Sequence, residues 1–482
     1  MSPAPAAPPG AFLLPLALVL PAIGVALAAL LGGRYAQRVA LGTVAASLGL
    51  AVAIARAVWR AGDALEYLVG GWAPPLGITL RADGLSAAML VTSALLIGAA
   101  ALYGRADFTG PARGEARAPL AFWTLLLTVW TGLTAAFLAG DLFNQFVALE
   151  LLTFGAVPLV SLGGSATTLR AALRYLLFAL IGSVLFLLGV GLLYGAYGTL
   201  DLALLAGRVR VDPAARVAAA LMTVGLLAKA ALFPLHLWLP PAHAGAPPAA
   251  SAVLSALVVK APFFLAVRLW FDALPGLATP AAEQLLGALG AGAIVFGGVL
   301  AVRQERLKLL VAYSTVAQIG YLFLVFPLAA AGPAAVTGGL VQAIAHALAK
   351  TAMFLAVGLL ARGLGHDRID GLAGAARALP LSLLAFGLGG VSLVGLQPSL
   401  LRRTALETGQ WWWVAAMLAG GALTATYVVR VLTHTRSASG APAELHAPVE
   451  RSRELLALAL ALAAFAVRML PLASLLRIGR GA

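Results

Sequence analysis

The chain has 482 residues, of which 62% are hydrophobic and only 10% are charged. Ordinary soluble domains carry about 25% charged residues, and apolar runs of about 20 residues recur here from Ala11 onward, so a soluble protein is excluded. The net charge of +14 comes from 28 arginines and only four lysines, and the chain has no cysteine. Disulfides and cysteine-held iron–sulfur clusters are therefore excluded, and we expect no redox centre, cofactor or metal site in this chain.

Apolar runs bounded by charges or by Pro and Gly clusters predict fourteen transmembrane helices, and hence an all-α polytopic membrane protein. They cover residues 11–32, 38–58, 84–103, 118–139, 142–163, 169–196, 215–235, 249–271, 281–301, 309–330, 333–361, 375–396, 410–432 and 454–476. Odd-numbered connections carry more Lys and Arg than even-numbered ones. Because cytoplasmic loops are the basic ones, we expect a bacterial-type inner membrane location with both termini extracytoplasmic.

Two of these helices are interrupted, helix 7 at Phe233-Pro234 and helix 12 between Gly395 and Pro398. Paired broken helices indicate inverted repeats, so we expect two five-helix repeats, helices 4–8 and 9–13. The resulting division of the chain is residues 1–117, 118–271, 281–432 and 433–482. Residues 59–83 are expected to form an extracytoplasmic loop, and residues 437–448 a linker before the last helix.

Few ionisable residues lie deep inside the predicted spans, where each charge costs about 2.5–3.5 kcal/mol and is functional by default. Glu150 is the single acid there, and the cations are Lys229, Lys260 and Lys350. Arginine stays protonated, whereas a lysine removed from water can release its proton near neutral pH. His346 lies four residues before Lys350 and therefore on the same helical face. These five residues are the predicted proton relay.

Each of these positions also has a structural interpretation. A buried Glu–Lys pair can simply hold two helices together. His236 and His243 flank a Pro-rich turn, where they either cap a helix or admit protons. Tyr313 and Ser314 either pack helix 10 or line a hydrated path. The fourth lysine, Lys308, is interpreted as a solvated interfacial charge.

Energy-coupling and nucleic-acid motifs are not found in the sequence. It contains no G-x-x-x-x-G-K-[ST] loop, which argues against ATP-driven pumping by the chain itself. Its basic residues are spread over the predicted cytoplasmic loops, a pattern that fits anionic lipid headgroups better than nucleic acid.

Four blocks of the sequence resemble the antiporter-like subunits shared by respiratory complex I, membrane-bound hydrogenases and Mrp-type Na⁺/H⁺ antiporters. They are LTAAFLAGDLFNQFVALELLTFG, LLAKAALFPLHLWLPPAHAGAPPAASAVLSALVVKA, LKLLVAYSTVAQIGYLFL and HALAKTAMFLAVG. The resemblance spans roughly residues 60 to 430. Within the family, the chain is similar to the fourteen-helix type, which includes the D-type Mrp protein and the N-type and M-type proteins of complex I.

The resemblance implies roles for the buried charges. Glu150 on helix 5 matches the glutamate that pairs with a lysine on helix 7, here Lys229. Lys260 matches the lysine that continues the path on helix 8, and His346 and Lys350 match the histidine and lysine of helix 11. Together they imply a hydrated charged axis at the bilayer midplane.

The sequence departs from the family pattern at two places. The acid that usually follows Leu-Pro in helix 7 is replaced in Leu239-Pro240-Pro241. Helix 12 usually carries a terminal Lys or Glu, whereas residues 397–404 offer only Arg402 and Arg403, which we take as candidates for the terminal site. An arginine can attract an anion but does not readily release a proton.

We therefore expect a membrane subunit that translocates protons, and that exchanges them for Na⁺ if it is of the Mrp type, together with other membrane subunits. The alternative is a pumping subunit of an NADH-quinone oxidoreductase or membrane-bound hydrogenase, with every redox centre on other chains. A third interpretation, favoured only by the altered helix 12, is a scaffold that does not conduct.

Overall fold

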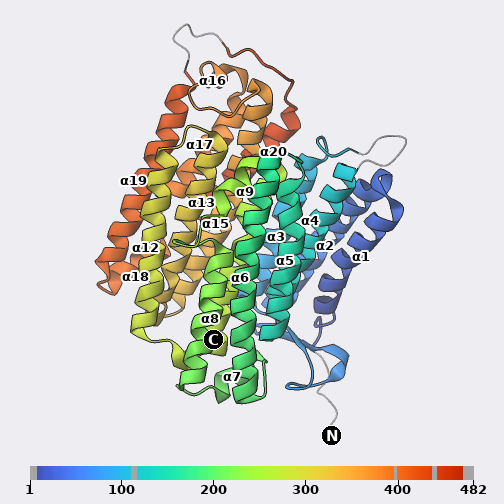
Figure 1. The fold of residues 1–482 in the computed structure, drawn as a ribbon, viewed down its shortest axis with the longest axis vertical. Helices are drawn as coiled ribbons and strands as arrows, with labels where there is room; N and C mark the ends of the chain where they lie inside the picture. Colours follow the sequence, from blue (N-terminus) through green and yellow to red (C-terminus); the bar gives the residue numbers. More distant parts are fainter. Residues whose placement is uncertain (1–7, 110–116, 396–398, 437–441, 470–482) are drawn as a thin grey trace.

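The computed structural model describes residues 8–109, 117–395, 399–436 and 442–469. Long helices run side by side in a single bundle (Figure 1). The helices are α1 (Leu13–Leu31), α2 (Gly33–Ala61), α3 (Gly84–Gly104), α4 (Arg117–Leu138), α5 (Leu142–Ser161), α6 (Ala166–Tyr197), α7 (Leu202–Arg208), α8 (Pro213–Ala230), α9 (Leu239–Gly245), α10 (Pro248–Val253), α11 (Lys260–Val267), α12 (Pro280–Val302), α13 (Leu307–Phe323), α14 (Val325–Leu328), α15 (Pro333–Leu364), α16 (Ala375–Ala378), α17 (Pro380–Val394), α18 (Leu400–Glu407), α19 (Trp411–His434) and α20 (Arg451–Val467). Tight turns η1 (Val69–Gly71), η4 (Pro275–Leu277) and η5 (Ala329–Ala331) and wide π turns η2 (Leu254–Val258) and η3 (Arg268–Ala273) complete them.

The predicted all-α polytopic fold is confirmed. Within the described residues, 12 helices are long and apolar enough to cross a membrane, and each coincides with a predicted span. The two remaining predicted spans correspond to α17, with 15 residues, and α20, with 17 residues. The predicted span 454–476 continues beyond Met469, where the described residues end.

Side-chain caps set the starts of several helices. Asp83, Asp141 and Asp212 each accept a hydrogen bond from a backbone N–H in the first turn of α3, α5 and α8. Such a cap satisfies one of the donors that a helix start leaves unpaired. Because all three caps stand just before an apolar run, the beginnings of these helices are encoded locally.

Both interrupted helices are present, although their boundaries differ from the prediction. Helix 7 is divided into α8 and α9, since Ala231 adopts a left-handed conformation (φ 56°) and Pro234 follows soon after. Helix 12 is divided into α17 and α18, and residues 396–398 between them lie outside the described residues. The predicted start of helix 12 at residue 375 is wrong, because the four-residue α16 ends before Pro380 opens α17. The inverted-repeat relation and the four-part division of the chain stay predictions.

The predicted loop of residues 59–83 contains a β-hairpin that was not predicted. Strand β1 (Leu65–Leu68) pairs antiparallel with β2 (Thr79–Ala82), with Leu65 opposite Ala82. The hairpin lies at the same end of the bundle as α7 (Figure 1). Four-residue strands carry too little alternation for a sequence pattern to distinguish them from loop.

Small residues bring α6 and α8 close together beside the buried charges. A Cβ added at Gly225 would lie 2.4 Å from the Gly182 carbonyl oxygen, and one added at Gly182 would lie 2.8 Å from that of Gly225. Neither position therefore has room for a side chain. This close approach places Lys229, four residues after Gly225, directly against α5 and α6.

Candidate functional site

Glu150 on α5 and Lys229 on α8 form an ion pair, as predicted from the sequence. The Lys229 Nζ donates to Glu150 Oε1 at 3.0 Å, to Thr153 Oγ1 at 2.9 Å and to the Leu149 carbonyl at 3.2 Å. Glu150 Oε1 also accepts from the Ser183 hydroxyl of α6. The side chain of Lys229 is 4% exposed and that of Glu150 is 19% exposed. The pair thus joins three helices, with all three ammonium protons directed at oxygen atoms.

Lys260 lies where the π turn η2 joins α11 and is completely buried. Its Nζ donates to the Ser255 carbonyl at 2.7 Å, within the wide turn. The Ser255 hydroxyl shares a hydrogen bond of 2.8 Å with Thr315 of α13. Such π turns are rare in proteins, and those that do occur are often found at functional sites. Among the described residues, no carboxylate forms an ion pair with Lys260.

Lys350 and His346 lie one turn apart on α15, and both are completely buried. The Lys350 Nζ donates to the Val311 carbonyl at 3.2 Å and to the Ser314 hydroxyl of α13. Neither ring nitrogen of His346 has a hydrogen-bond partner in the described part of the chain. The imidazole lies within electrostatic reach of Lys260, Lys350 and Arg468. The structure therefore brings the predicted residues Lys260, His346 and Lys350 into one cluster, which we call the central cluster.

The other predicted path residues are divided by the structure. His243 on α9 is completely buried, stacks on Phe354 at 4.7 Å and lies within electrostatic reach of Lys350, Lys308 and Lys260, so it borders the central cluster. His236, in the break of helix 7, stacks instead on Phe233 at 5.7 Å.

On α13, Ser314 contacts Lys350 directly, whereas Tyr313 is only half-buried. Lys308, interpreted from the sequence as a solvated interfacial charge, is half-buried. Its Nζ donates to the Ala246 carbonyl at 3.0 Å, at the carboxyl end of α9. A cation there complements the partial negative charge of the helix terminus.

The two arginines proposed for the end of the path lie differently. Arg403 is exposed and pairs with Glu407 on the same helix, at 2.7 Å. Arg402 faces a cavity beside the end of α17. Consecutive residues of a helix point about 100° apart, and of the two only Arg402 lines this cavity.

A polar chain next to the central cluster was not predicted from the sequence. Arg468 at the end of α20 donates to Gln342 Oε1 at 2.8 Å, Gln342 donates to Gln318 Oε1 at 2.9 Å, and Gln318 donates to the Leu393 carbonyl at 3.1 Å. This chain joins α15 and α13 to the end of α17. Glutamines inside apolar spans are uncommon, and that signal could have identified Gln318 and Gln342.

Comparisons with known proteins identify the family. Residues 139–426 match the family described as NADH:quinone oxidoreductase/Mrp antiporter, TM. The chain is 35% identical over 436 residues to the N-type chain of NADH-quinone oxidoreductase from Desulforudis audaxviator, covering 87% of this chain and 85% of the relative. It is 29% identical over 361 residues to the D-type chain of the Na⁺/H⁺ antiporter from Bacillus subtilis, covering 74% and 71%.

A solved structure shares the fold across almost the entire chain. The structure of the Mrp complex from Dietzia sp. DQ12-45-1b contains a chain that superposes with a TM-score of 0.86 at 26% identity, covering 98% of this chain and 96% of that one. Residues 139–426, which match the family, include the Glu150–Lys229 pair and the whole central cluster. The chain belongs to the NADH:quinone oxidoreductase/Mrp antiporter family of transmembrane subunits.

Proposed function

We propose that this proton-translocating membrane subunit passes H⁺ from the Glu150–Lys229 pair through Lys260 to His346 and Lys350. The observation that carries the proposal is the central cluster. Lys260 and Lys350 are completely buried, yet their Nζ atoms are bonded only to carbonyl and hydroxyl oxygens. A buried ammonium without a counter-ion is costly, and lysine can avoid that cost by releasing its proton, whereas arginine cannot.

The Glu150–Lys229 pair is proposed to act as the switch. When Glu150 is ionised and close, its charge favours the protonated form of Lys229, and protonation or withdrawal of Glu150 removes that support. The proton affinity of Lys229 therefore depends on the state of Glu150. The imidazole of His346 has no hydrogen-bond partner among the described residues and lies within electrostatic reach of both lysines, so it can accept or donate a proton through either ring nitrogen.

The relatives suggest the setting in which the subunit works. One belongs to a Na⁺/H⁺ antiporter, one belongs to an NADH-quinone oxidoreductase, and the superposed structure is an Mrp complex. We propose that this chain likewise assembles with other membrane subunits in a bacterial-type inner membrane, with its termini on the extracytoplasmic side. Exchange of H⁺ for Na⁺ is part of the proposal for an Mrp-type assembly.

Proton flux through the purified assembly reconstituted in vesicles tests the relay. Glu150→Gln and Lys229→Ala should each lower the flux by about 100-fold, the scale of a positioned proton-transfer group. Glu407→Gln is the matched control, because Glu407 is an exposed acid whose partner is a surface arginine. Flux equal to the parent in both relay variants, with the assembly intact, would instead support the scaffold interpretation.

A further inference from the structure

Arg468, which directly follows α20, carries a positive charge that the proposed relay does not use. Its guanidinium donates to Gln342 Oε1 at 2.8 Å, and its buried Nε has no partner. It forms no ion pair with any residue that the structure describes. The two most buried arginines, Arg268 and Arg453, are instead paired with aspartates. Because arginine keeps its proton even when it is buried, Arg468 is a fixed charge without a described counter-ion.

The hydrogen bond to Gln342 places this charge next to the central cluster. Gln342, His346 and Lys350 follow one another at four-residue intervals on α15, so they share one helical face. Four residues correspond to about 6 Å along a helix. The charged groups within electrostatic reach of His346 are Lys260 at the start of α11, Lys350 on its own helix and Arg468. All three are cations, and only the charge of Arg468 is permanent.

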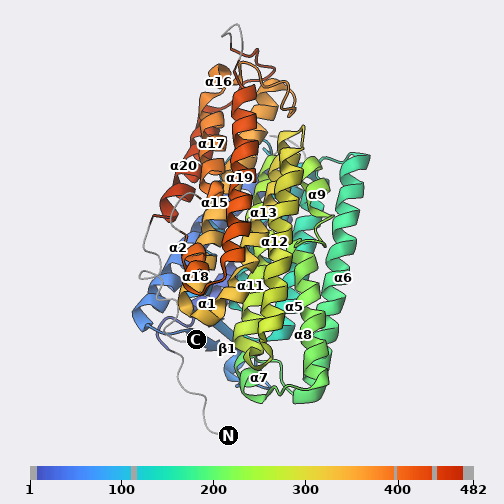
Figure 2. The same ribbon diagram turned by 90° about the vertical axis from the view of Figure 1, so that its left-hand side faces the viewer.

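A cavity of about 230 Å³ adjoins Arg468 and Gln342, between the end of α17, α18, α19 and the end of α20. Figure 2 shows these four helices gathered on one side of the bundle. The lining that α19 contributes, within residues 417–425, is at the middle of Trp411–His434, so the cavity lies at mid-span depth. A water molecule takes up about 30 Å³ in the liquid, and the cavity therefore has room for several. Polar side chains that could bind them are those of Tyr321, Gln342, Ser399, Arg402 and Arg468.

A fixed cation near an imidazole opposes the binding of a proton by that imidazole. A proton that the lysines pass to His346 is therefore held weakly, one helical turn from a polar cavity. We propose that Arg468 is a positioning residue for the last step of the relay, its charge making His346 release the proton toward water in this cavity. In that step an N–H bond of the imidazolium breaks, the proton passes to a water oxygen, and His346 returns to the neutral form. The inference rests on the proposed relay, to which it adds an exit.

The pH dependence of proton flux through the purified assembly in vesicles tests this role. In Arg468→Gln the imidazole of His346 should bind its proton more tightly, so the pH of half-maximal flux should rise. The rise should be about one unit, the scale expected for a unit charge about 10 Å away inside a protein. Arg303→Gln is the matched control, because Arg303 also directly follows a helix, α12, but is exposed. It should keep the parental pH profile.

Gln342→Glu separates the charge of Arg468 from its hydrogen bond. The new carboxylate keeps an oxygen for Arg468 and supplies the counter-ion that it lacks, so the pH profile should shift in the same direction as in Arg468→Gln. If Arg468 only held helices together, the stronger contact would leave the profile parental. Should Arg468→Gln fail to fold, Gln342→Glu decides alone.

Failure of this inference is distinguishable from failure of the relay. Parental flux in Glu150→Gln, measured alongside, would reject the relay itself. Lowered flux in Glu150→Gln, together with parental pH profiles in Arg468→Gln and Gln342→Glu, would reject only the role of Arg468. A shift in Arg468→Gln without one in Gln342→Glu would also reject it, because the effect would then come from the shape of the side chain and not from its charge.

Discussion

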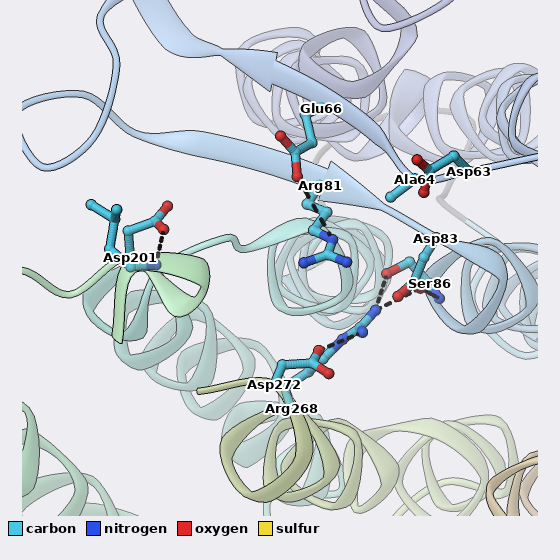
Figure 3. A network of polar contacts seen from close by, with 10 residues as sticks. Asp63, Ala64, Glu66, Arg81, Asp83, Ser86, Asp201, Arg268 and Asp272 are labelled. Atoms are coloured by element: carbon cyan, nitrogen blue, oxygen red, sulfur yellow. Dashed lines mark hydrogen bonds and ion pairs between the residues drawn. The ribbon is translucent and has the colours of Figure 1, made fainter. Parts of the chain in front are cut away.

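Two cations on the same membrane span have opposite surroundings. Lys260 lies in the middle of the segment from Pro248 to Ala273, and its Nζ meets only the neutral Ser255 carbonyl. Arg268, eight residues later, is held between Asp83 at 2.6 Å and Asp272 at 2.7 Å (Figure 3). We call Arg268 and these two aspartates the end cluster.

The difference follows from the chemistry of the two side chains. Arginine cannot shed its charge, so burying it requires fixed counter-ions, and the end cluster supplies two. Lysine can exist as a neutral amine, so the central cluster can do without a carboxylate. We infer that the end cluster fixes the structure and that the central cluster is available to exchange protons.

The largest expected effect is on flux, at Lys260. Lys260→Arg and Lys260→Ala should both lower proton flux by about 100-fold. The arginine does not release its proton and the alanine cannot bind one, so neither side chain can pass a proton on. Lys308→Arg is the control, since it makes the same replacement at a lysine that caps α9. Parental flux in Lys260→Arg would show that the position needs only a positive charge. It would contradict the inference that the central cluster exchanges protons whereas the end cluster does not.

A second effect, on stability, is expected at the end cluster. Asp83→Asn removes one of the two counter-ions of Arg268 and should lower the free energy of unfolding by about 2–3 kcal/mol. The flux per folded molecule should stay near the parental value. Thermal unfolding in detergent measures the first quantity and reconstituted vesicles the second.

Asp63→Asn is the control for this stability effect, because the Asp63 carboxylate is exposed and accepts only from the Ala64 N–H. It should unfold like the parent. If Asp83→Asn instead lost flux and kept its stability, the end cluster would be part of the conducting path.

Acid should destabilise the end cluster in a defined pH range. Burial by itself raises the pKa of the Asp83 carboxyl, but the adjacent Arg268 guanidinium outweighs it and holds the pKa well below its usual range. A group with a lowered folded-state pKa contributes its full stabilisation above its unfolded pKa of about 4 and loses it as the pH falls below that value. The unfolding temperature of the parent should therefore fall toward that of Asp83→Asn as the pH is lowered from about 5 to about 3. A constant gap between the two proteins would contradict this assignment.

The smallest expected effect concerns the link between Lys260 and Lys350. The Ser255–Thr315 hydrogen bond connects the π turn η2 to α13. The Ser255 carbonyl of η2 accepts from Lys260, and the Val311 carbonyl of α13 accepts from Lys350. Losing one neutral hydrogen bond costs about 1 kcal/mol, so Ser255→Ala or Thr315→Val should lower flux about fivefold. Thr92→Val is the control, since its hydroxyl bonds only to the Ala88 carbonyl of its own helix. An equal loss in that control would assign the effect to general helix packing.

Much of the fold was predictable because it depends on local rules. Apolar runs long enough to span a bilayer located the helices, and Pro234 marked the break in helix 7. The β-hairpin was missed because strands of four residues show no distinct period. The start of helix 12 was placed too early because Ala375 to Leu379 is mostly apolar, whereas Pro380 opens a separate helix.

The candidate site was predictable only in part. Glu150, Lys229, Lys260 and Lys350 stood out because charges are rare at membrane depth. The residues that hold them, such as Ser255 and Thr315, are ordinary hydroxyl side chains of which the spans contain many. Their roles depend on which helices lie side by side.

The sequence by itself determined that this protein spans a membrane many times and that three of its four lysines lie at membrane depth. Both conclusions follow from the free energy of transferring each residue into hydrocarbon, which is a property of residues taken singly. Only the tertiary structure decided which cations receive counter-ions. Arg268 has Asp272 four residues further along its own segment, and the fold adds Asp83 from 185 residues away, whereas among the described residues it brings no carboxylate to Lys260.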